Sequence, residues 1–384
     1  MAGMTLATLP EHRPVRCIMS QQTLPNQLPR LGFHYYPDTI HYRQSDFSVW
    51  LPVLRELGAS WLTLFAPANR AIPEFFLTGL LANGIEPILH HHLSLESPPS
   101  PQDLHPIFQA YARWGVRYIA LFDRPNRRAA WPSAIWAQRH LVERFLDLYL
   151  PLAEVAQQDG LIPVFPPLEP GGDFWDTAFI RLAAQSLRRR KYASIPDPWI
   201  MSCYAWASNR PLDWGAGGPE RWPGARPYGN PVGEQDQCGF RIFEWYLALA
   251  QAELSQACAI LLLGAGCQLG GQADPMTPPV DEITHAWQNI EIARNMCEPT
   301  ISATGIPAEV LACNFWLLTT TSDSPYAQHG WFQPQGRPLP VVGAFHQWLN
   351  TLSTEASEQA GIHLATTKLT IEGSSYDRNL TRIP

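Results

Sequence analysis

The feature that most constrains the fold of this chain is a regular alternation of short apolar segments with longer amphipathic ones. Eight segments have the length and composition of strands, and each is followed by a segment with helical periodicity. Asp46 is a candidate cap for the first helix, and Gly58 is expected to end it. The predicted strands cover residues 31–37, 61–67, 87–93, 117–122, 161–168, 199–204, 259–263 and 310–319; the predicted helices cover residues 46–57, 73–83, 104–114, 136–158, 175–190, 240–255, 281–296 and 341–352.

Apolar strands joined by helices are typical of a parallel sheet that is buried on both faces. Eight such units close into a barrel more naturally than they form an open sheet. The alternative, a doubly wound sheet, would favour a glycine-rich phosphate loop after the first strand, where this chain has Tyr35-Tyr36-Pro37-Asp38. We therefore predict an α/β fold: a single-domain (β/α)8 TIM barrel over residues 31–352, with an N-terminal extension (1–30) and a C-terminal tail (353–384).

The composition of the chain limits the kinds of partner and the location that can be expected. The net charge is −7 and charged residues make up only 16% of the chain, so nucleic acid is not an expected partner. The seven cysteines are scattered, no signal-peptide pattern is seen at the start, and no apolar run is long enough to span a membrane. These observations predict a cytoplasmic protein. The 15 tryptophans suit sugar rings or core packing equally well.

Chemistry in a barrel of this kind is located at the carboxyl ends of the strands. In this chain those ends are polar and aromatic, as expected of a binding site. The candidates are His34, His90, His92, Asp123, Arg124, Asn126, Glu169, Tyr204, Trp206 and Trp316.

The order of these residues resembles that of the retaining glycoside hydrolases with (β/α)8 barrels (clan A type). In that clan strand four usually ends in Asn-Glu-Pro, whose Glu is the acid/base, and strand seven ends in the nucleophilic Glu. This chain has Asp123-Arg124-Pro125 at the first place and Gly264-Ala265 at the second. The resemblance therefore implies a glycoside hydrolase-like barrel in which both usual catalytic glutamates are replaced.

Two further features carry the resemblance, which covers residues 31–352. Tyr204 and Trp316 match an aromatic pair that such enzymes place around the sugar. The stretch from Gly330-Trp331-Phe332 to the Gly-x-Pro-x-Pro turn at 336–340 resembles the clan's ending before the last helix.

The substitutions remove the standard mechanism. Retaining hydrolysis needs two carboxyl groups, and Arg124, Gly264 and Ala265 offer none. Asp123 and Glu169 lie at the ends of neighbouring predicted strands and are the best substitutes if hydrolysis occurs. The alternative, which we favour, is that Asp123 pairs with Arg124 or Arg127 and that Glu169 braces the turn after it.

His90-His91-His92 raises the question of a metal. Only His90 and His92 share a face of the strand, and a site would need His34 or Asp123 as a further ligand. Because such histidines also serve as sugar partners and core donors, we expect no metal and no cofactor. The longest connection, 207–237, is either a lid with ligand-stacking aromatics or a self-packed or oligomer-contact loop.

Three functions stay open. The first is carbohydrate binding at the barrel mouth with impaired or absent hydrolysis, with Arg124 acting as a clamp for a uronic or sulfated sugar. The second is an active glycosidase that uses Asp123 and Glu169. The third is a structural or scaffold subunit with a protein partner.

Overall fold

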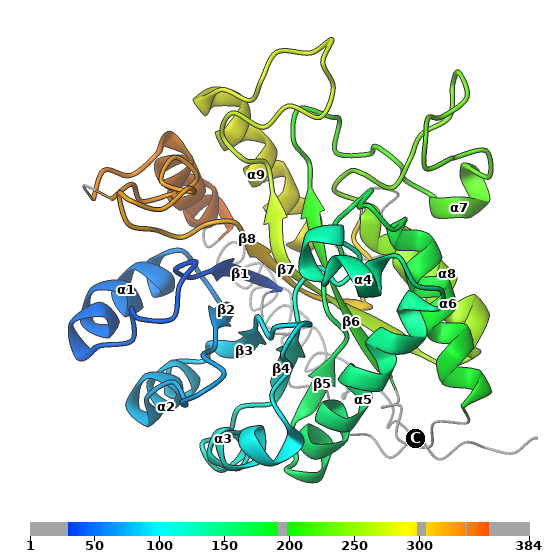
Figure 1. The fold of residues 1–384 in the computed structure, drawn as a ribbon. Coiled ribbons are helices and arrows are strands. Elements are labelled where there is room, and N and C mark those ends of the chain that lie inside the picture. The colour runs from blue at the N-terminus through cyan, green and yellow to red at the C-terminus, as the bar shows by residue number, and fades with distance from the viewer. Residues whose placement is uncertain (1–29, 191–197, 298–304, 335, 353–384) are drawn as a thin grey trace, which may run out of the picture.

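The computed structural model describes residues 30–190, 198–297, 305–334 and 336–352. Within these ranges the chain alternates strands and helices around a central parallel sheet (Figure 1). The strands are β1 (Leu31–His34), β2 (Trp61–Phe65), β3 (Glu86–His91), β4 (Tyr118–Leu121), β5 (Ile162–Val164), β6 (Trp199–Trp206), β7 (Cys258–Gly266) and β8 (Val310–Phe315).

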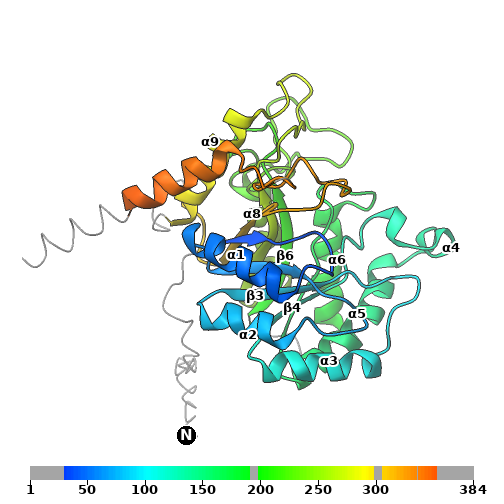
Figure 2. The same cartoon turned by 90° about the vertical axis from the view of Figure 1, so that its left-hand side faces the viewer.

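Helices surround this sheet. Seen from the side, the final helix, residues 340–352, lies near α9 and α1 and completes the outer layer (Figure 2). The others are α1 (Gln44–Glu56), α2 (Glu74–Ala82), α3 (Pro101–Arg113), the 3-10 turn η1 (Arg128–Ala130), α4 (Ser133–Trp136), α5 (Leu141–Gln158), α6 (Asp176–Arg189), α7 (Gly218–Arg221), α8 (Ile242–Leu254) and α9 (Glu282–Cys297).

The sheet forms a (β/α)8 barrel, as predicted. Seven ladders join the strands in the order β5-β4-β3-β2-β1-β8-β7-β6, and every pairing is parallel. The two remaining edges meet through a single parallel bridge, in which Phe165 N donates to Ile200 O at 2.9 Å and Ser202 N donates to Phe165 O at 2.9 Å. The barrel is therefore closed, with its thinnest seam between β5 and β6.

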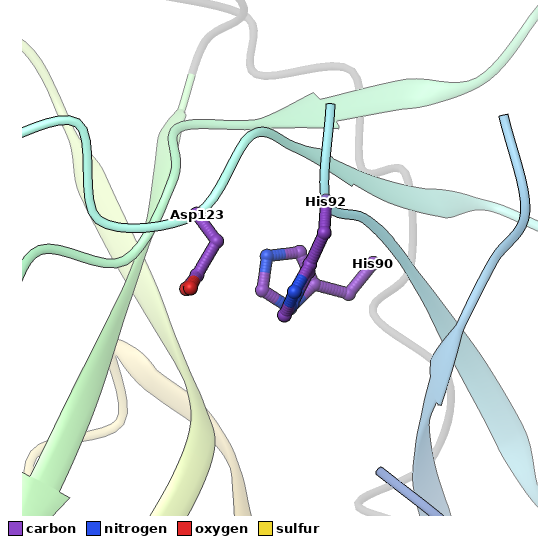
Figure 3. A group of neighbouring side chains, drawn as sticks. All are labelled: His90, His92 and Asp123. Atoms are coloured by element: carbon purple, nitrogen blue, oxygen red, sulfur yellow. The ribbon is translucent and has the colours of Figure 1, made fainter. Parts of the chain in front are cut away.

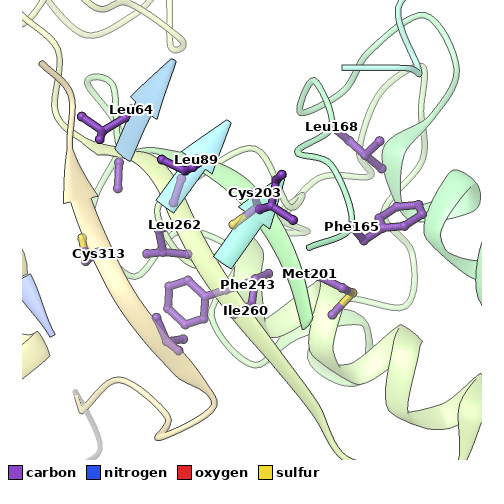
Figure 4. Packing of buried hydrophobic residues seen from close by; sticks show 14 of the residues in the cluster. Leu64, Leu89, Phe165, Leu168, Met201, Cys203, Phe243, Ile260, Leu262 and Cys313 are labelled. Atoms are coloured by element: carbon purple, nitrogen blue, oxygen red, sulfur yellow. The ribbon is translucent and has the colours of Figure 1, made fainter. Parts of the chain in front are cut away.

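Successive side chains of each strand point alternately into the barrel and toward the helices, which produces two apolar layers. On β7, Leu261 and Leu263 belong to a cluster inside the barrel, whereas Ile260 and Leu262 pack outward toward the helices. Figure 4 shows part of the outer layer, in which strand residues gather around Phe243 of α8. The near-complete burial of the strands confirms that both faces of the sheet are covered.

Several boundaries differ from the prediction. Asp46 is not the cap of α1: it lies in the first turn, and its carboxylate accepts a hydrogen bond from the Arg43 N–H at 2.8 Å. The predicted helix over 136–158 is interrupted before α5, since His140 has a left-handed φ of 65°. Strand β5 ends at Val164, shortly before Pro166 and Pro167, which have no N–H for a ladder.

The predicted N-terminal extension (1–30) and C-terminal tail (353–384) lie outside the described residues, apart from Arg30. None of the helices in the described ranges has the length and apolar character needed to cross a membrane.

Candidate functional site

The carboxyl ends of the strands bring nine of the ten predicted residues to one end of the barrel. They comprise His34 at the end of β1, His90 and His92 at the end of β3, Asp123 and Arg124 after β4, Glu169 after β5, Tyr204 and Trp206 at the end of β6, and Trp316 after β8.

Asp123, Arg124 and Glu169 form a charged cluster. Arg124 Nε donates to Asp123 Oδ2 at 2.7 Å, and Arg124 Nη1 donates to Glu169 Oε2 at 3.2 Å. Tyr204 Oη donates to the other oxygen of Asp123 at 2.7 Å. The guanidinium therefore lies between the two carboxylates, and the width of its planar group places them at most about 8 Å apart.

The backbone around Asp123 is unusual. Phe122 and Arg124, on either side of it, have φ values of 69° and 43°. Left-handed conformations of bulky residues cost of order 1–3 kcal/mol each and concentrate at functional sites. They are held here by the N–H of Phe122, which donates to His91 O at 2.8 Å, and the N–H of Arg124, which donates to Pro167 O at 2.9 Å.

Asn126 has a different position from the other candidates. It is completely buried, and its amide donates to Glu169 O at 2.8 Å and to Phe174 O at 3.0 Å. Its carbonyl oxygen accepts from the N–H of Glu169 at 2.8 Å. Asn126 thus ties the loop after β4 to the loop after β5 and fixes the backbone of Glu169. A direct contact with a ligand stays a prediction.

The electrostatics of the cluster favour an ionised Asp123. Burial alone would raise its pKa, but His92, His90, Arg124 and the Tyr204 hydroxyl outweigh it and lower the pKa below the usual value. Two carboxylates against one guanidinium leave one negative charge in excess at neutral pH. Arg124 already contacts two carboxylates in this structure, and its action as a clamp for an anionic sugar stays a prediction.

Three aromatic rings cover the place where a nucleophile from β7 would stand. Tyr204 and Trp206 are stacked, with centroids 5.3 Å apart and planes at 9°, and Trp316 meets Trp206 edge-on at 5.9 Å. A Cβ on Gly264 would lie 2.8 Å from Trp206 Cη2, 3.2 Å from Tyr204 Cδ1 and 3.4 Å from Trp316 Cε3. The absence of a side chain at Gly264 is what allows the three rings to approach one another.

Three histidines lie beside the aromatic rings, and His34 packs directly against Trp316. His90 Nε2 contacts Phe122 O at 2.9 Å, and His92 Nε2 lies 3.2 Å from His90 Nδ1 (Figure 3). His34 is buried between Phe65 and Trp316, both at 4.6 Å, and its ring nitrogens have no hydrogen-bond partner among the described residues. Burial, reinforced by His90 and His92, holds the pKa of His34 well below its usual value.

Sequence reasoning missed residues that support Trp316. Its indole N–H donates to His329 Nδ1 at 3.3 Å, and Tyr326 meets its ring edge-on at 5.1 Å. Both lie between β8 and the last helix, and their position before the Gly330-Trp331-Phe332 run is the only signal that pointed to them. Trp331 itself is fully buried against Phe33 and Phe315, so it belongs to the core.

The long 207–237 connection packs largely on itself. The Trp214 indole donates to Asp236 Oδ1 at 2.7 Å, and the Trp222 indole donates to Ala216 O at 2.9 Å. Trp222 also lines a cavity of about 390 Å³ on the outside of the barrel, which Trp175 of the loop before α6 and Trp245 of α8 share. The contacts favour the self-packed alternative over a lid for these two tryptophans.

Comparison with known proteins supports the fold alone. No protein-family model and no curated protein matches the sequence. Among solved structures, the barrel is similar to a family 39 glycoside hydrolase from the gut symbiont Bacteroides cellulosilyticus, with a TM-score of 0.53 at 11% identity, over 83% of this chain and 63% of that one.

Two other similar structures are more distant. They are a β-glucuronidase from an uncultured Clostridium (TM-score 0.49, 10% identity, 84% of this chain and 50% of that one) and a family 128 endo-β-1,3-glucanase from Sorangium cellulosum (TM-score 0.46, 12% identity, 83% and 97%). The chain thus spans less than two thirds of the first two proteins. The likeness to the first of these structures agrees with the (β/α)8 fold that the sequence predicted.

Proposed function

We propose that the carboxyl end of this barrel binds a carbohydrate and does not hydrolyse it by the retaining mechanism of glycoside hydrolases. The observation that carries the proposal is the packing of Tyr204, Trp206 and Trp316 over Gly264. Flat aromatic faces suit the apolar faces of sugar rings, and the same rings occupy the space that a nucleophilic side chain would need.

The charged cluster supports a neutral sugar. Arg124 is paired with both carboxylates, and the cluster retains one excess negative charge, so a uronic or sulfated sugar would be repelled. Glu169, whose side chain is 36% exposed, is available to accept hydrogen bonds from sugar hydroxyls. Trp206, the partly exposed ring of the three, is the expected stacking platform.

The test is binding to an array of neutral and anionic glycans, followed by titration calorimetry on the best ligand. We expect Trp206→Ala to weaken binding at least about tenfold, because it removes the stacking face. Trp287→Ala, which removes a 59% exposed tryptophan on α9, is the matched control and is expected to leave the affinity unchanged. Binding of no glycan, or equal effects of the two variants, would contradict the proposal.

The alternative of an active glycosidase with Asp123 and Glu169 has one observation in its favour: a separation of at most about 8 Å is compatible with glycosidase geometries. Against it, a general acid needs a raised pKa, whereas the pKa of Asp123 is lowered. Release of reducing sugar from a polysaccharide panel, abolished in Asp123→Asn and Glu169→Gln, would establish this alternative and remove the first.

A scaffold function with a protein partner also has a specific observation. Tyr228, Val232 and Met276 are almost fully exposed in the loops that follow β6 and β7. Contiguous exposed apolar patches mark protein contacts, and these three side chains are the ones that such a contact would use. Copurification with one fixed partner, lost on substitution of these residues by serine, would support it. A cytoplasmic location stays part of the proposal, on the basis of the scattered cysteines.

A further inference from the structure

Three metal-ligating side chains converge beside the aromatic site. His90 and His92 alternate at the end of β3, so they point to the same side, and Asp123 follows the neighbouring strand β4 (Figure 3). One potential ligand atom from each of the three lies within 4.8 Å of the other two. Two imidazoles and one carboxylate are a donor set that binds divalent transition metals, zinc in particular.

The hydrogen bonds around the three residues have the form of an outer ligand shell. Phe122 O is an acceptor only, so the His90 Nε2 at 2.9 Å from it carries the proton and His90 Nδ1 presents a lone pair. Tyr204 and Arg124 each donate to one oxygen of Asp123 and fix the carboxylate. Each carboxylate oxygen keeps a further lone pair.

The separations suit a tetrahedral ion. Two nitrogen ligands at tetrahedral angles and ordinary zinc distances stand about 3.3 Å apart, and His90 Nδ1 and His92 Nε2 are 3.2 Å apart. In the metal-free protein this contact is a hydrogen bond from His92 Nε2 to His90 Nδ1, and metal binding would require the His92 proton to stand on its Nδ1 instead. The Asp123 oxygen, within 4.8 Å, needs to approach by up to about 1.5 Å, and the carboxylate would exchange part of its hydrogen bonding to Tyr204 and Arg124 for the metal.

The charge around His90, His92 and Asp123 and the exposure of His92 to solvent also favour a bound cation. The surrounding cluster of Asp123, Glu169 and Arg124 has one uncompensated negative charge, which attracts a cation. His90 is buried and Asp123 partly buried, whereas His92 is exposed to solvent, so an ion can reach the three side chains from the barrel end. His34, whose ring packs against Phe65 and Trp316, is not one of the three.

We propose that His90 Nδ1, His92 Nε2 and the Asp123 carboxylate bind one divalent transition-metal ion, Zn²⁺ being the best match, with a fourth position open toward the barrel mouth. Through that position the ion would accept water or a hydroxyl of a bound ligand. The proposal concerns metal affinity and stands whether or not the site takes a sugar.

The experiment is a titration of the full-length, tag-free protein, freed of metal with a chelator, with Zn²⁺ against a competing fluorescent chelator. We expect one equivalent to bind, and X-ray absorption of the zinc complex to show two imidazole ligands at about 2.0 Å. His92→Asn and Asp123→Asn are each expected to weaken binding at least about tenfold.

His105→Gln, which changes an exposed histidine on α3, is the control and is expected to keep the affinity of the wild type. Thermal melts of all four proteins without metal separate loss of ligands from loss of folding. Absence of saturable binding by the folded wild type, or binding that survives both ligand substitutions, would overturn the metal site. Either result would leave glycan binding to be decided by the array, which is run in the presence of chelator.

Discussion

At Gly264 the backbone of β7 runs beside three aromatic rings with no space for a side chain. The sequence shows only that a carboxylate is missing from this position. The structure adds that its place is filled, since Tyr204, Trp206 and Trp316 meet over the missing Cβ. The packing of the three rings thus requires that position 264 has no side chain.

We predict that Gly264→Ala lowers the free energy of unfolding by about 1–3 kcal/mol, because the new methyl group must displace the Trp206 ring from 2.8 Å. Urea unfolding measures the change. In a Trp206→Leu background the cost should fall below about 1 kcal/mol. Gly343→Ala, on the exposed side of the last helix with nothing within 4 Å, is the control and should be neutral or slightly stabilising. Equal costs at the two glycines would contradict the packing argument.

His91 belongs to the outer face of β3. Its ring is buried against Phe108 and Tyr111 of α3, with centroids 6.1 Å and 6.2 Å away. Neither ring nitrogen has a hydrogen-bond partner within the part of the chain that the structure describes. Burial, with a smaller contribution from His90, lowers the pKa of His91 to about 3.

This shift makes stability depend on pH. The pKa of this histidine is about 6.5 in the unfolded chain and about 3 in the folded protein, so between these pH values only the unfolded chain binds the proton. The free energy of unfolding therefore decreases as the pH falls through this range. We expect His91→Leu to remove this part of the loss, which amounts to about 2 kcal/mol between pH 7 and pH 5. Urea unfolding of both proteins at the two pH values measures it, and parallel losses in wild type and variant would refute it.

At the scale of elements, strand lengths show what the sequence can and cannot predict. The existence of β6 and β7 was read from their apolar runs, yet both extend beyond the predicted ends, to Trp206 and Gly266. Their added residues pair with each other across the sheet, and such long-range pairing leaves no local signal. β5 is shorter than its apolar run and ends shortly before Pro166 and Pro167, which have no N–H for a ladder.

Arg30 joins the start of β1 to the start of β8. Its guanidinium donates to four backbone carbonyls, those of Pro307 (2.6 Å), Val310 (3.1 Å), Met296 (2.9 Å) and Ile306 (3.1 Å). These carbonyls lie from the last turn of α9 to the first residue of β8. The contact fastens the first strand to the last at the end of the barrel opposite the site.

We predict that Arg30→Met lowers the free energy of unfolding by about 2–4 kcal/mol, since four acceptors lose a charged donor. Arg55→Met, on the exposed last turn of α1, should change it by less than about 0.5 kcal/mol. Urea titrations of both variants provide the comparison, and a cost at Arg30 no larger than at Arg55 would show that the link is unimportant.

For the whole molecule, the barrel was predictable because eight strand–helix repeats leave little choice of topology. The set of side chains at its carboxyl end was predictable for the same reason. Their pairing was not: whether Arg124 faces a ligand or bridges Asp123 and Glu169 depends on rotamers and on the left-handed turn at Phe122. The ring packing over Gly264 likewise depends on contacts between three different strand ends.

The seam between β5 and β6 is expected to be the point where the barrel opens first. It rests on the single bridge at Phe165, whereas β6 and β7 pair along their whole lengths. We predict that the amides of Phe165 and Ser202 exchange with deuterium at least about tenfold faster than those of Leu261 and Leu263. Residue-resolved exchange measures this. Equal protection at both places would mean that the barrel opens as one cooperative unit.

The pairing of Arg124 with two carboxylates also affects which substitutions could introduce glycoside hydrolysis into this barrel. Exchanging Arg124 for glutamate alone would set three carboxylates against one another, and giving β7 a glutamate alone would collide with Trp206. Each of these single substitutions is expected to disturb the site. Carboxylates at the two positions usual for the clan would therefore have to be introduced together with changes in the groups that surround them.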